Sequence, residues 1–484
     1  MSTTATSSEQ VSAPLHQTAE EDKVPLPTKV GFGLGNLVGH FTGNLTKELM
    51  TPVFVVALGL SPLLVGAALT IFNIYHAMIT PVMGWISDNT RTRWGRRRPY
   101  VVLGAVLSAI AMPLIWLVQP GWSATTIAIW LIVTGVILHT ASTIHGVGFE
   151  SFSLELTPDY AERTRINSVK LVVSSISGPV IGYAWLITQM DYFKDPVTGN
   201  PDTLAGARGL ALLAAVVVLV AGILPALMAK ERYYGAASQQ NKSSLLDNLK
   251  TGFKNRSFMI LAGISVLAVT ASAMFNGIGF YTNLYYVCQG NAKLAAEITG
   301  AQSMLYLPVS IASIFMFQAI SMRIGKTRTL AIALGLSLAA MLCRWWILRP
   351  DMPWLSLVST ALIAMGVSGM WQIIPAMVAD TVDEEELKST QRREGAIASI
   401  FSWFMNFSFS VGFGIPGVLV EFSGLVVSKG AEQGAGVVTA MRLWDALLPG
   451  GCTLAAIALL LMYPLSAQRM GEIRRALESR RGKM

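Results

Sequence analysis

Charged side chains are scarce in this chain of 484 residues: Asp, Glu, Lys and Arg together make up 13% of it. Soluble globular proteins carry about 25% of such residues. Hydrophobic residues reach 52%, and the mean hydropathy is +0.52. So few charges cannot cover the surface of a soluble protein of this length. The composition therefore predicts a polytopic membrane protein.

Cysteine is scarce as well. Cys288, Cys343 and Cys452 show neither metal-ligand spacing nor an even-numbered disulfide framework, so we interpret them as small apolar packing residues. The sequence also lacks a glycine-rich phosphate loop and a nucleophile constellation. We therefore expect no metal, no cofactor and no enzymatic activity.

The charge that is present is biased towards Lys and Arg, with a formal net charge of +8. In a soluble chain this would suggest nucleic acid, but here the basic residues gather in loops on one predicted side of a membrane. Such loops are retained in the cytoplasm, so we expect both termini to be cytoplasmic and no nucleic-acid partner. The basic loops span 88–98, 158–166, 230–257, 321–328, 380–394 and 466–484.

Apolar runs between polar breaks predict twelve membrane-spanning helices, because each is long enough to cross a ~30 Å hydrocarbon core. The longest interior polar break, 230–257, divides them six and six. Two six-helix halves with weak internal symmetry are typical of alternating-access carriers. The predicted spans cover 29–58, 61–87, 100–118, 125–156, 167–190, 207–229, 258–287, 298–320, 328–347, 354–379, 395–424 and 440–465.

The predicted fold is therefore all-α, with two pseudo-symmetric six-helix bundles. Residues 1–28 are polar and lack a signal-type apolar core, so we expect a disordered cytoplasmic tail. In the linker, Leu245, Leu246, Leu249 and Phe253 recur at helical spacing and predict an amphipathic helix on the inner membrane face. The predicted domains are the tail 1–28, the first bundle 29–229, the linker 230–257, the second bundle 258–465 and a basic cytoplasmic tail 466–484.

Three polar passages on one predicted membrane side carry a family resemblance. The first is Arg91-Thr-Arg-Trp-Gly-Arg-Arg-Arg-Pro99, preceded by Gly84 and Asp88; the second runs from Glu155 to Ser168, and the third from Met377 to Gly395. Together, and in this order, they resemble the glycoside–pentoside–hexuronide:cation symporter family of the major facilitator superfamily, to which melibiose permease belongs. The resemblance implies cation-coupled uptake of a sugar or glycoside.

In these passages, acidic residues beside arginines could form pairs that latch the halves together and break when they rock. The alternative is that the charges serve only topology and solubility. The candidate gating residues are Asp88, Arg91, Arg96, Arg97, Asp380, Arg392 and Arg393.

The chain departs from the family at the positions that bind sodium in its sodium-coupled members. Where those relatives have two carboxylates in the second span, this chain has His76 and Thr80. The position of their fourth-span carboxylate is occupied by Gly146, and that of their eleventh-span lysine by Asn406. The first-span sugar-binding aspartate falls on Val38 or His40. Sodium prefers several oxygen ligands including carboxylate, so sodium coupling is doubtful. A proton needs one titratable group, and His76 or Glu150 would serve; an uncoupled facilitator is the alternative.

Polar and ionisable residues inside predicted spans are the candidate site residues, because such groups are unfavourable in lipid. His40, Asn44 and Lys47 share one face of an α-helix, unless Lys47 and Glu48 reach the outer interface instead. Glu150 in the fourth span faces Lys170, the counterpart of the family's fifth-span basic residue; a structural ion pair is the alternative. For the second half, where core packing is the alternative, the candidates are Asn276, Tyr281, Gln302, Trp371, Gln372, Trp403 and Asn406.

Because the family's sugar-binding carboxylates are missing and His and Lys stand nearby, we expect an acidic solute such as a uronate-bearing glycoside. A non-sugar organic anion or an amphipathic solute is the alternative. We expect a proton symporter in the bacterial cytoplasmic membrane, in contact with lipid and functional as a monomer.

Overall fold

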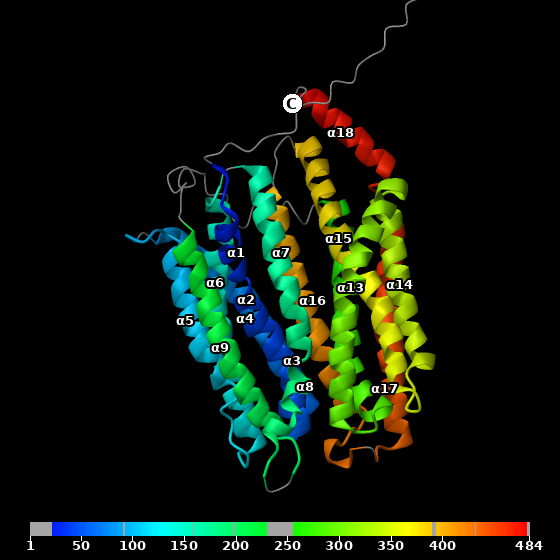
Figure 1. Ribbon diagram of the computed structural model, residues 1–484. Coiled ribbons are helices and arrows are strands. Elements are labelled where there is room, and N and C mark those ends of the chain that lie inside the picture. The colour runs from blue at the N-terminus through cyan, green and yellow to red at the C-terminus, as the bar shows by residue number, and fades with distance from the viewer. Residues whose placement is uncertain are drawn as a thin grey trace, which may run out of the picture.

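The computed structural model describes residues 22–90, 92–157, 159–196, 199–229, 255–389, 394–430 and 432–481. Within these ranges the chain is helical, and the only extended pairings are two isolated bridges, Thr92 with Gly95 and Lys194 with Pro201. Figure 1 shows long helices that run roughly parallel in two halves standing side by side. The predicted all-α class is confirmed.

The first half contains a segmented first rod followed by five further helical rods. Its elements are α1 (Leu26–Leu34), α2 (Leu37–Gly39), η2 (His40–Leu45), α3 (Thr46–Met50), η3 (Thr51–Ala57), α4 (Pro62–Asn89), α5 (Arg98–Leu114), α6 (Ala124–Glu155), α7 (Tyr160–Gly182), α8 (Ala184–Thr188), η4 (Asp191–Phe193) and α9 (Thr203–Met228).

The second half repeats this plan, and a further helix follows it at the C-terminus. Its elements are α12 (Arg256–Tyr281), η5 (Thr282–Val287), α13 (Ala292–Ile324), α14 (Lys326–Ile347), η6 (Pro353–Leu355), α15 (Ser356–Ser389), α16 (Glu394–Phe422), η7 (Val427–Lys429), α17 (Ala435–Leu461) and α18 (Ala467–Arg481). The helix α18 falls in the predicted basic tail.

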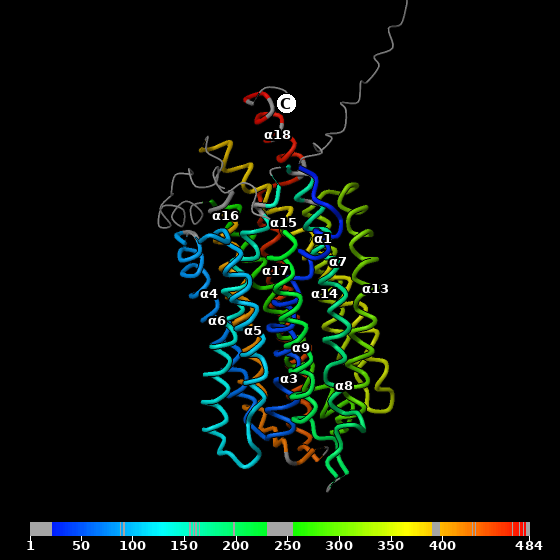
Figure 2. The backbone as a smooth tube through the Cα atoms, turned by 60° about the vertical axis from the view of Figure 1, so that its left-hand side comes forward, coloured from blue at the N-terminus to red at the C-terminus, as the bar shows by residue number. Residues whose placement is uncertain are grey.

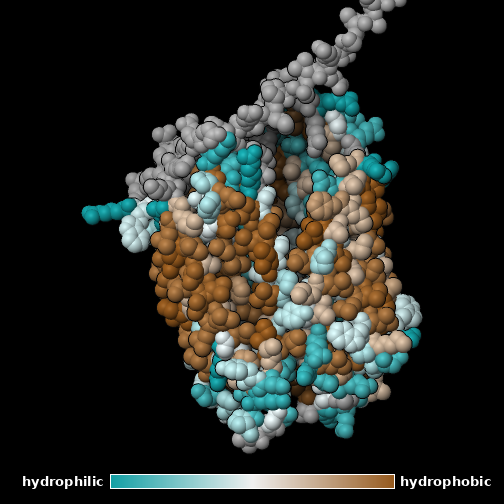
Figure 3. All heavy atoms as spheres, viewed as in Figure 1, coloured by the Kyte–Doolittle hydropathy of each residue, from teal (hydrophilic) through white to brown (hydrophobic). Residues whose placement is uncertain are grey.

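Within the described residues, ten helices are long and apolar enough to cross a membrane. Each of the twelve predicted spans coincides with helical structure, but α5 is shorter and the first rod is segmented, so the count of twelve crossings stays a prediction. Figure 3 shows a hydrophobic band over the middle of the visible face, between hydrophilic ends. That pattern matches a protein surrounded by lipid.

The first rod departs from a regular α-helix. Two π-helical segments, η2 and η3, interrupt it. A π-helix closes hydrogen bonds at i→i+5 and is frequent at functional sites. It also changes which residues share a face. The i, i+4, i+7 spacing of an α-helix, on which the predicted face of His40, Asn44 and Lys47 depends, therefore does not hold along this rod.

The two halves touch at the end opposite the described chain termini. There the start of α4 packs on the last turns of α16, where a Cβ built on Gly66 would lie 3.1 Å from the Cα of Gly417. Beside it, the Ser61 hydroxyl donates to Glu421 at 2.6 Å. We call this contact the closed end. Towards the other end, which we call the open end, the surface in Figure 3 is hollowed between the halves.

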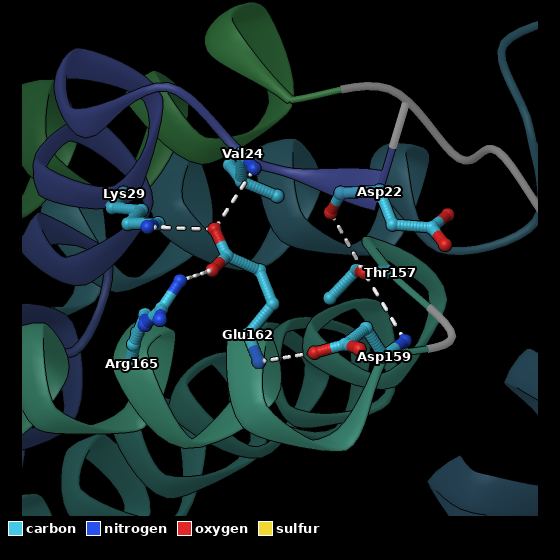
Figure 4. A network of polar contacts seen from close by, with 7 residues as sticks. All are labelled: Asp22, Val24, Lys29, Thr157, Asp159, Glu162 and Arg165. Carbon is cyan, nitrogen blue, oxygen red and sulfur yellow. Dashed lines mark hydrogen bonds and ion pairs between the residues drawn. The ribbon is translucent and has the colours of Figure 1, made fainter. Parts of the chain in front are cut away.

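Both described ends of the chain lie at the open end, as the rotated view in Figure 2 also shows for α1 and α18. Residues 22–25, inside the predicted tail, lead directly into α1. Their order has a physical cause: Glu162 accepts hydrogen bonds from the Val24 amide at 2.9 Å and pairs with Lys29 at 2.6 Å (Figure 4). Residues 1–21 and 230–254, including the predicted amphipathic helix, lie outside the described residues.

Candidate functional site

A chamber of about 690 Å³ lies between the two halves, next to the closed end. Segments from both halves line it, including α3, α4, α7, α12, α13, α14, α15 and α16. A cavity at the interface of two repeats is where carriers of this architecture bind their solutes. Five of the predicted site residues line it: Asn44, Lys47, Asn276, Tyr281 and Gln302.

Two adjacent ionisable side chains, Lys47 and Glu48, line the chamber from α3. Among the described residues neither takes part in a hydrogen bond or an ion pair. The Lys47 ammonium instead lies over the rings of Phe413 and Phe409, 5.0 and 5.9 Å from their centroids. Both rings belong to α16, so this cation–π contact joins the two halves. The first rod thus presents a cation and a carboxyl to whatever occupies the chamber.

Neutral polar groups supply the rest of the lining. Gln302 of α13 donates to the hydroxyl of Ser356 at 3.3 Å, and the Asn276 amide on α12 donates to the Ser272 carbonyl at 2.9 Å. The amide oxygens of both side chains remain available as acceptors. Amides and hydroxyls at fixed positions in an apolar wall are the groups that orient a small polar ligand.

Aromatic rings lead from the chamber along α15 and α16. Phe413 stacks on Phe409 with centroids 6.0 Å apart, and Phe409 on Trp371 at 6.4 Å. The predicted residue Trp371 therefore does not line the chamber itself, but the stacked rings of Phe409 and Phe413 connect it to the lining. Trp403 stacks on Phe407 at 6.0 Å, outside the lining.

The other two predicted residues of this region also lie outside the lining. Asn406 donates to the Ser402 carbonyl at 3.0 Å. Gln372 carries a buried side-chain oxygen for which the described part of the chain supplies no hydrogen-bond donor.

Glu150 and Lys170 form an ion pair, which was the alternative role considered for them. Lys170 donates to both carboxylate oxygens, at 2.9 and 2.8 Å, and its ammonium lies 4.9 Å from the centroid of Phe149. The Lys170 side chain is buried, whereas that of Glu150 is 62% exposed. Neither residue lines the chamber, because the pair sits on the parts of α6 and α7 nearer the open end.

The three predicted residues His40, His76 and Thr80 lie in the first half, beside the chamber lining. The imidazole of His40 contacts the Ser177 hydroxyl at 3.1 Å, because η2 turns it towards α7. The ring of His76 meets that of His139 edge to face at 6.1 Å. Thr80 bonds the His76 carbonyl at 2.7 Å, satisfied within its own helix.

An ion pair in the second half was not predicted. Arg344 on α14 donates from Nε to Asp445 on α17 at 2.6 Å, and the side chains are 6% and 1% exposed. Arg344 lines the chamber. The signal was present in the sequence, because each is an ionisable residue inside a predicted span. Both lie near span ends in the sequence, where such residues usually reach the interface.

The predicted gating residues are partly placed. Asp380 on α15 pairs with Lys326 at the start of α14, at 2.7 Å, which ties two helices of the same half. Arg97 is buried and donates to the Ser87 hydroxyl at 2.7 Å, and Arg96 lies half-buried in the same loop. The side chain of Asp88 and residues Arg91, Arg392 and Arg393 lie outside the described residues, so the latch stays a prediction.

Comparison with known sequences decides the family. The sequence pattern of the MFS/sugar transport protein family matches residues 31–467. The chain belongs to this family. The predicted resemblance to glycoside symporters of the major facilitator superfamily is thereby confirmed, and the chain is a secondary transporter in a membrane that it crosses many times.

Among its relatives, the glucuronide carrier protein homolog of Escherichia coli is 23% identical, and the match covers 94% of this chain and 96% of the relative. The isoprimeverose transporter of Lactiplantibacillus pentosus is 24% identical, over 91% and 89%. Among solved structures, the nucleoside transporter NupG superposes with a TM-score of 0.65 at 14% identity, over 91% of this chain and all of that one. At that identity, the likeness supports the fold alone.

Proposed function

We propose that this transporter carries an acidic sugar, a uronate or a uronate-bearing glycoside, across the bacterial cytoplasmic membrane together with a proton. The two halves rock about the chamber, so that it opens to one side at a time. With both termini cytoplasmic, as the loop charges predict, the present arrangement is the inward-facing state, closed on the outer side.

The observation that carries this proposal is the uncommitted Lys47 in a chamber walled by amides and rings. A solute carboxylate would give the ammonium a charged partner, which is worth more than a neutral one in a low-dielectric cavity. The amides of Asn44, Asn276 and Gln302 suit sugar hydroxyls, and an aromatic face suits the apolar side of a pyranose ring. The similarity to a glucuronide carrier homolog points the same way.

Proton coupling is the second part of the proposal. The positions that carry carboxylates in sodium-coupled relatives hold His76 and Thr80, a poor ligand set for a hard cation. Titratable groups are close at hand: Glu48 lines the chamber with no hydrogen-bond or ion-pair partner in the part of the chain that the structure describes, and Glu150 and His76 lie in the first half outside the lining. An uncoupled facilitator would use none of them.

Counterflow in proteoliposomes tests the solute class. Liposomes loaded with unlabelled D-glucuronate should take up labelled D-glucuronate faster than liposomes loaded with D-glucose or D-xylose. D-Glucose carries a hydroxymethyl group in place of the carboxylate of glucuronate, and D-xylose lacks that carbon altogether. Equal exchange of glucose, or exchange of only non-sugar anions, would overturn the proposed solute.

A further inference from the structure

The ion pair of Arg344 and Asp445 is only partly satisfied, although it is almost fully buried. One hydrogen bond joins the two side chains, from Nε to Oδ2. The other carboxylate oxygen, Oδ1, is buried and has no hydrogen-bond partner among the residues that the structure describes. A buried pair usually fills its remaining lone pairs and protons, so this one is short of partners on its carboxylate side.

The guanidinium is short of partners as well. Neither Nη1 nor Nη2 of Arg344 donates a hydrogen bond among the described residues, and the side chain forms part of the chamber wall. Its planar face rests on Phe275, with Cζ 4.4 Å from the ring centroid. A guanidinium edge open to a cavity is the group that binds carboxylates bidentately.

Gly279 on α12 lies beside the Arg344–Asp445 ion pair on the chamber side, and its lack of a side chain leaves space there. A Cβ at this glycine would lie 2.9 Å from Nη2 of Arg344 and 3.5 Å from Oδ1 of Asp445. Gly279 and Arg344 line the chamber, and Asp445 is buried next to both. The absent side chain therefore leaves both the free guanidinium nitrogen and the free carboxylate oxygen next to the cavity.

No other charged group competes at Asp445 within the described residues. Its helix α17 packs against α12, α14 and η5. Arg344 is the charged side chain these segments direct at it, and their nearby titratable groups are the tyrosines 281, 285 and 286. One turn earlier on α17, Arg442 donates to the Trp345 carbonyl at 2.7 Å and stacks on Trp345 and Tyr286. The charge balance at Asp445 thus depends on Arg344 and on what enters the chamber.

We propose that Asp445 carries the coupled proton and that the solute's carboxylate takes its place on Arg344, with Lys47 as the second cation of the chamber wall that attracts it. This inference rests on the proposed acidic solute. It differs from the expectation of His76 or Glu150 as the proton carrier. Arg344, the ion-pair partner of Asp445, lines the chamber, whereas Lys170, the partner of Glu150, does not, and His76 contacts the ring of His139.

The charges balance at each step. A proton from the side to which the chamber is open binds the Asp445 carboxylate, which becomes a neutral acid and leaves Arg344 without an anionic partner. The solute carboxylate then pairs with the guanidinium, so the chamber gains one proton and one anion together. On the other side the solute leaves, Asp445 returns the proton to water, and the ion pair re-forms. A monoanionic solute is therefore moved without net charge.

Proton uptake on solute binding tests this assignment. Purified protein in weakly buffered detergent, at a pH near 7, receives D-glucuronate while a pH indicator reports protons taken up and tryptophan fluorescence reports binding. We expect one proton per bound glucuronate in the unaltered protein and in Asp191→Asn, an exposed control at the closed-end loop. Asp445→Asn should bind without proton uptake, and Asp445→Glu, which keeps a titratable group, should restore it.

The outcomes separate this inference from the proposed function. Failure of the unaltered protein to bind glucuronate would overturn the proposed solute. Binding with proton uptake that persists in Asp445→Asn, or that is lost in Glu48→Gln instead, would overturn the role of Asp445 alone. If Asp445→Asn does not fold, the double variant with Arg344→Gln removes both charges. It should lose proton uptake and weaken glucuronate binding by about tenfold or more; unchanged uptake or affinity would contradict the proposal.

Discussion

At the scale of single residues, the chamber differs from the rest of the molecule in how its charges are used. Two carboxylates nearer the open end are paired with lysines, Glu150 with Lys170 and Asp380 with Lys326. In the chamber, Lys47 and Glu48 have no such partners within the described ranges of the chain, and Arg344 donates there only from Nε. Unpaired charge in a membrane protein is retained where it has a use.

Lys47 gives the first residue-scale prediction. Lys47→Gln replaces the ammonium by a neutral amide, on a side chain one atom shorter, and so removes the charge that we assign to the solute carboxylate. We expect its KM for D-glucuronate in counterflow to rise roughly 10- to 100-fold, because a charged hydrogen bond is worth about 1.5–3 kcal/mol. Lys293→Gln, at an exposed position, should leave the KM unchanged. An unaltered KM in Lys47→Gln would remove this residue from the binding site.

Arg344 and Asp445 give a prediction on stability. Asp445→Asn alone leaves a buried guanidinium without its anion, which typically costs about 3–5 kcal/mol. Adding Arg344→Gln removes the second charge and should recover most of that loss. Thermal unfolding in detergent of the two single variants and the double variant measures the coupling. Additive losses would mean that the two side chains do not stabilise each other.

At the scale of elements, the first rod explains why the candidate site was only partly predictable. The i, i+4, i+7 spacing grouped His40, Asn44 and Lys47 on one face, and in the structure Asn44 and Lys47 line the chamber. It did not place His40, because the π-helical segment η2 turns that ring to Ser177. Nothing in the local residue pattern distinguishes a π-helix from an α-helix, since the packing around it decides the register.

The anchoring of α1 by Glu162 is a second feature of this scale. Asp159 caps α7 by accepting from the Glu162 amide, and Glu162 holds Lys29, the Val24 amide and Arg165 (Figure 4). Burial alone would raise the pKa of Glu162, but these donors outweigh it and hold the pKa below its usual value. The carboxylate therefore stabilises the fold at neutral pH.

Glu162→Gln should lower the free energy of unfolding by about 2 kcal/mol at pH 7, the loss expected for a buried charged hydrogen-bonding group. Because the folded pKa lies below the unfolded one, the contribution is complete above the unfolded pKa near 4 and disappears as the pH falls through the folded pKa. Unfolding curves of both proteins between pH 7 and pH 3 should converge at the acidic end. A constant difference would exclude ionised Glu162 as the cause.

At the scale of the whole molecule, composition and span counting predicted a two-half helical bundle, because lipid allows few other structures. The chamber itself was not visible in the sequence. It depends on residues far apart along the chain, such as Lys47 with Phe413 and Arg344 with Asp445, whose meeting is set by how long helices pack. Spacing along one helix carries no information about such contacts.

The closed end gives a prediction on conformational change. A side chain at Gly417 would bring its Cβ to 2.5 Å from the Pro62 carbonyl oxygen, so Gly417→Val should prevent α4 and α16 from closing. We expect counterflow to fall at least about tenfold while the protein still folds. Gly335→Val, on α14 where a Cβ meets open space, is the matched control. Normal counterflow in Gly417→Val would show that this contact need not form.

The central claim is that an acidic sugar and a proton cross together through one chamber, and uphill transport measures it most directly. Proteoliposomes with an imposed gradient of one pH unit, acid outside, should accumulate D-glucuronate about tenfold, the limit for one proton per solute. A membrane potential or a sodium gradient alone should drive none. Accumulation driven by sodium, or equilibration without accumulation under the pH gradient, would contradict the account.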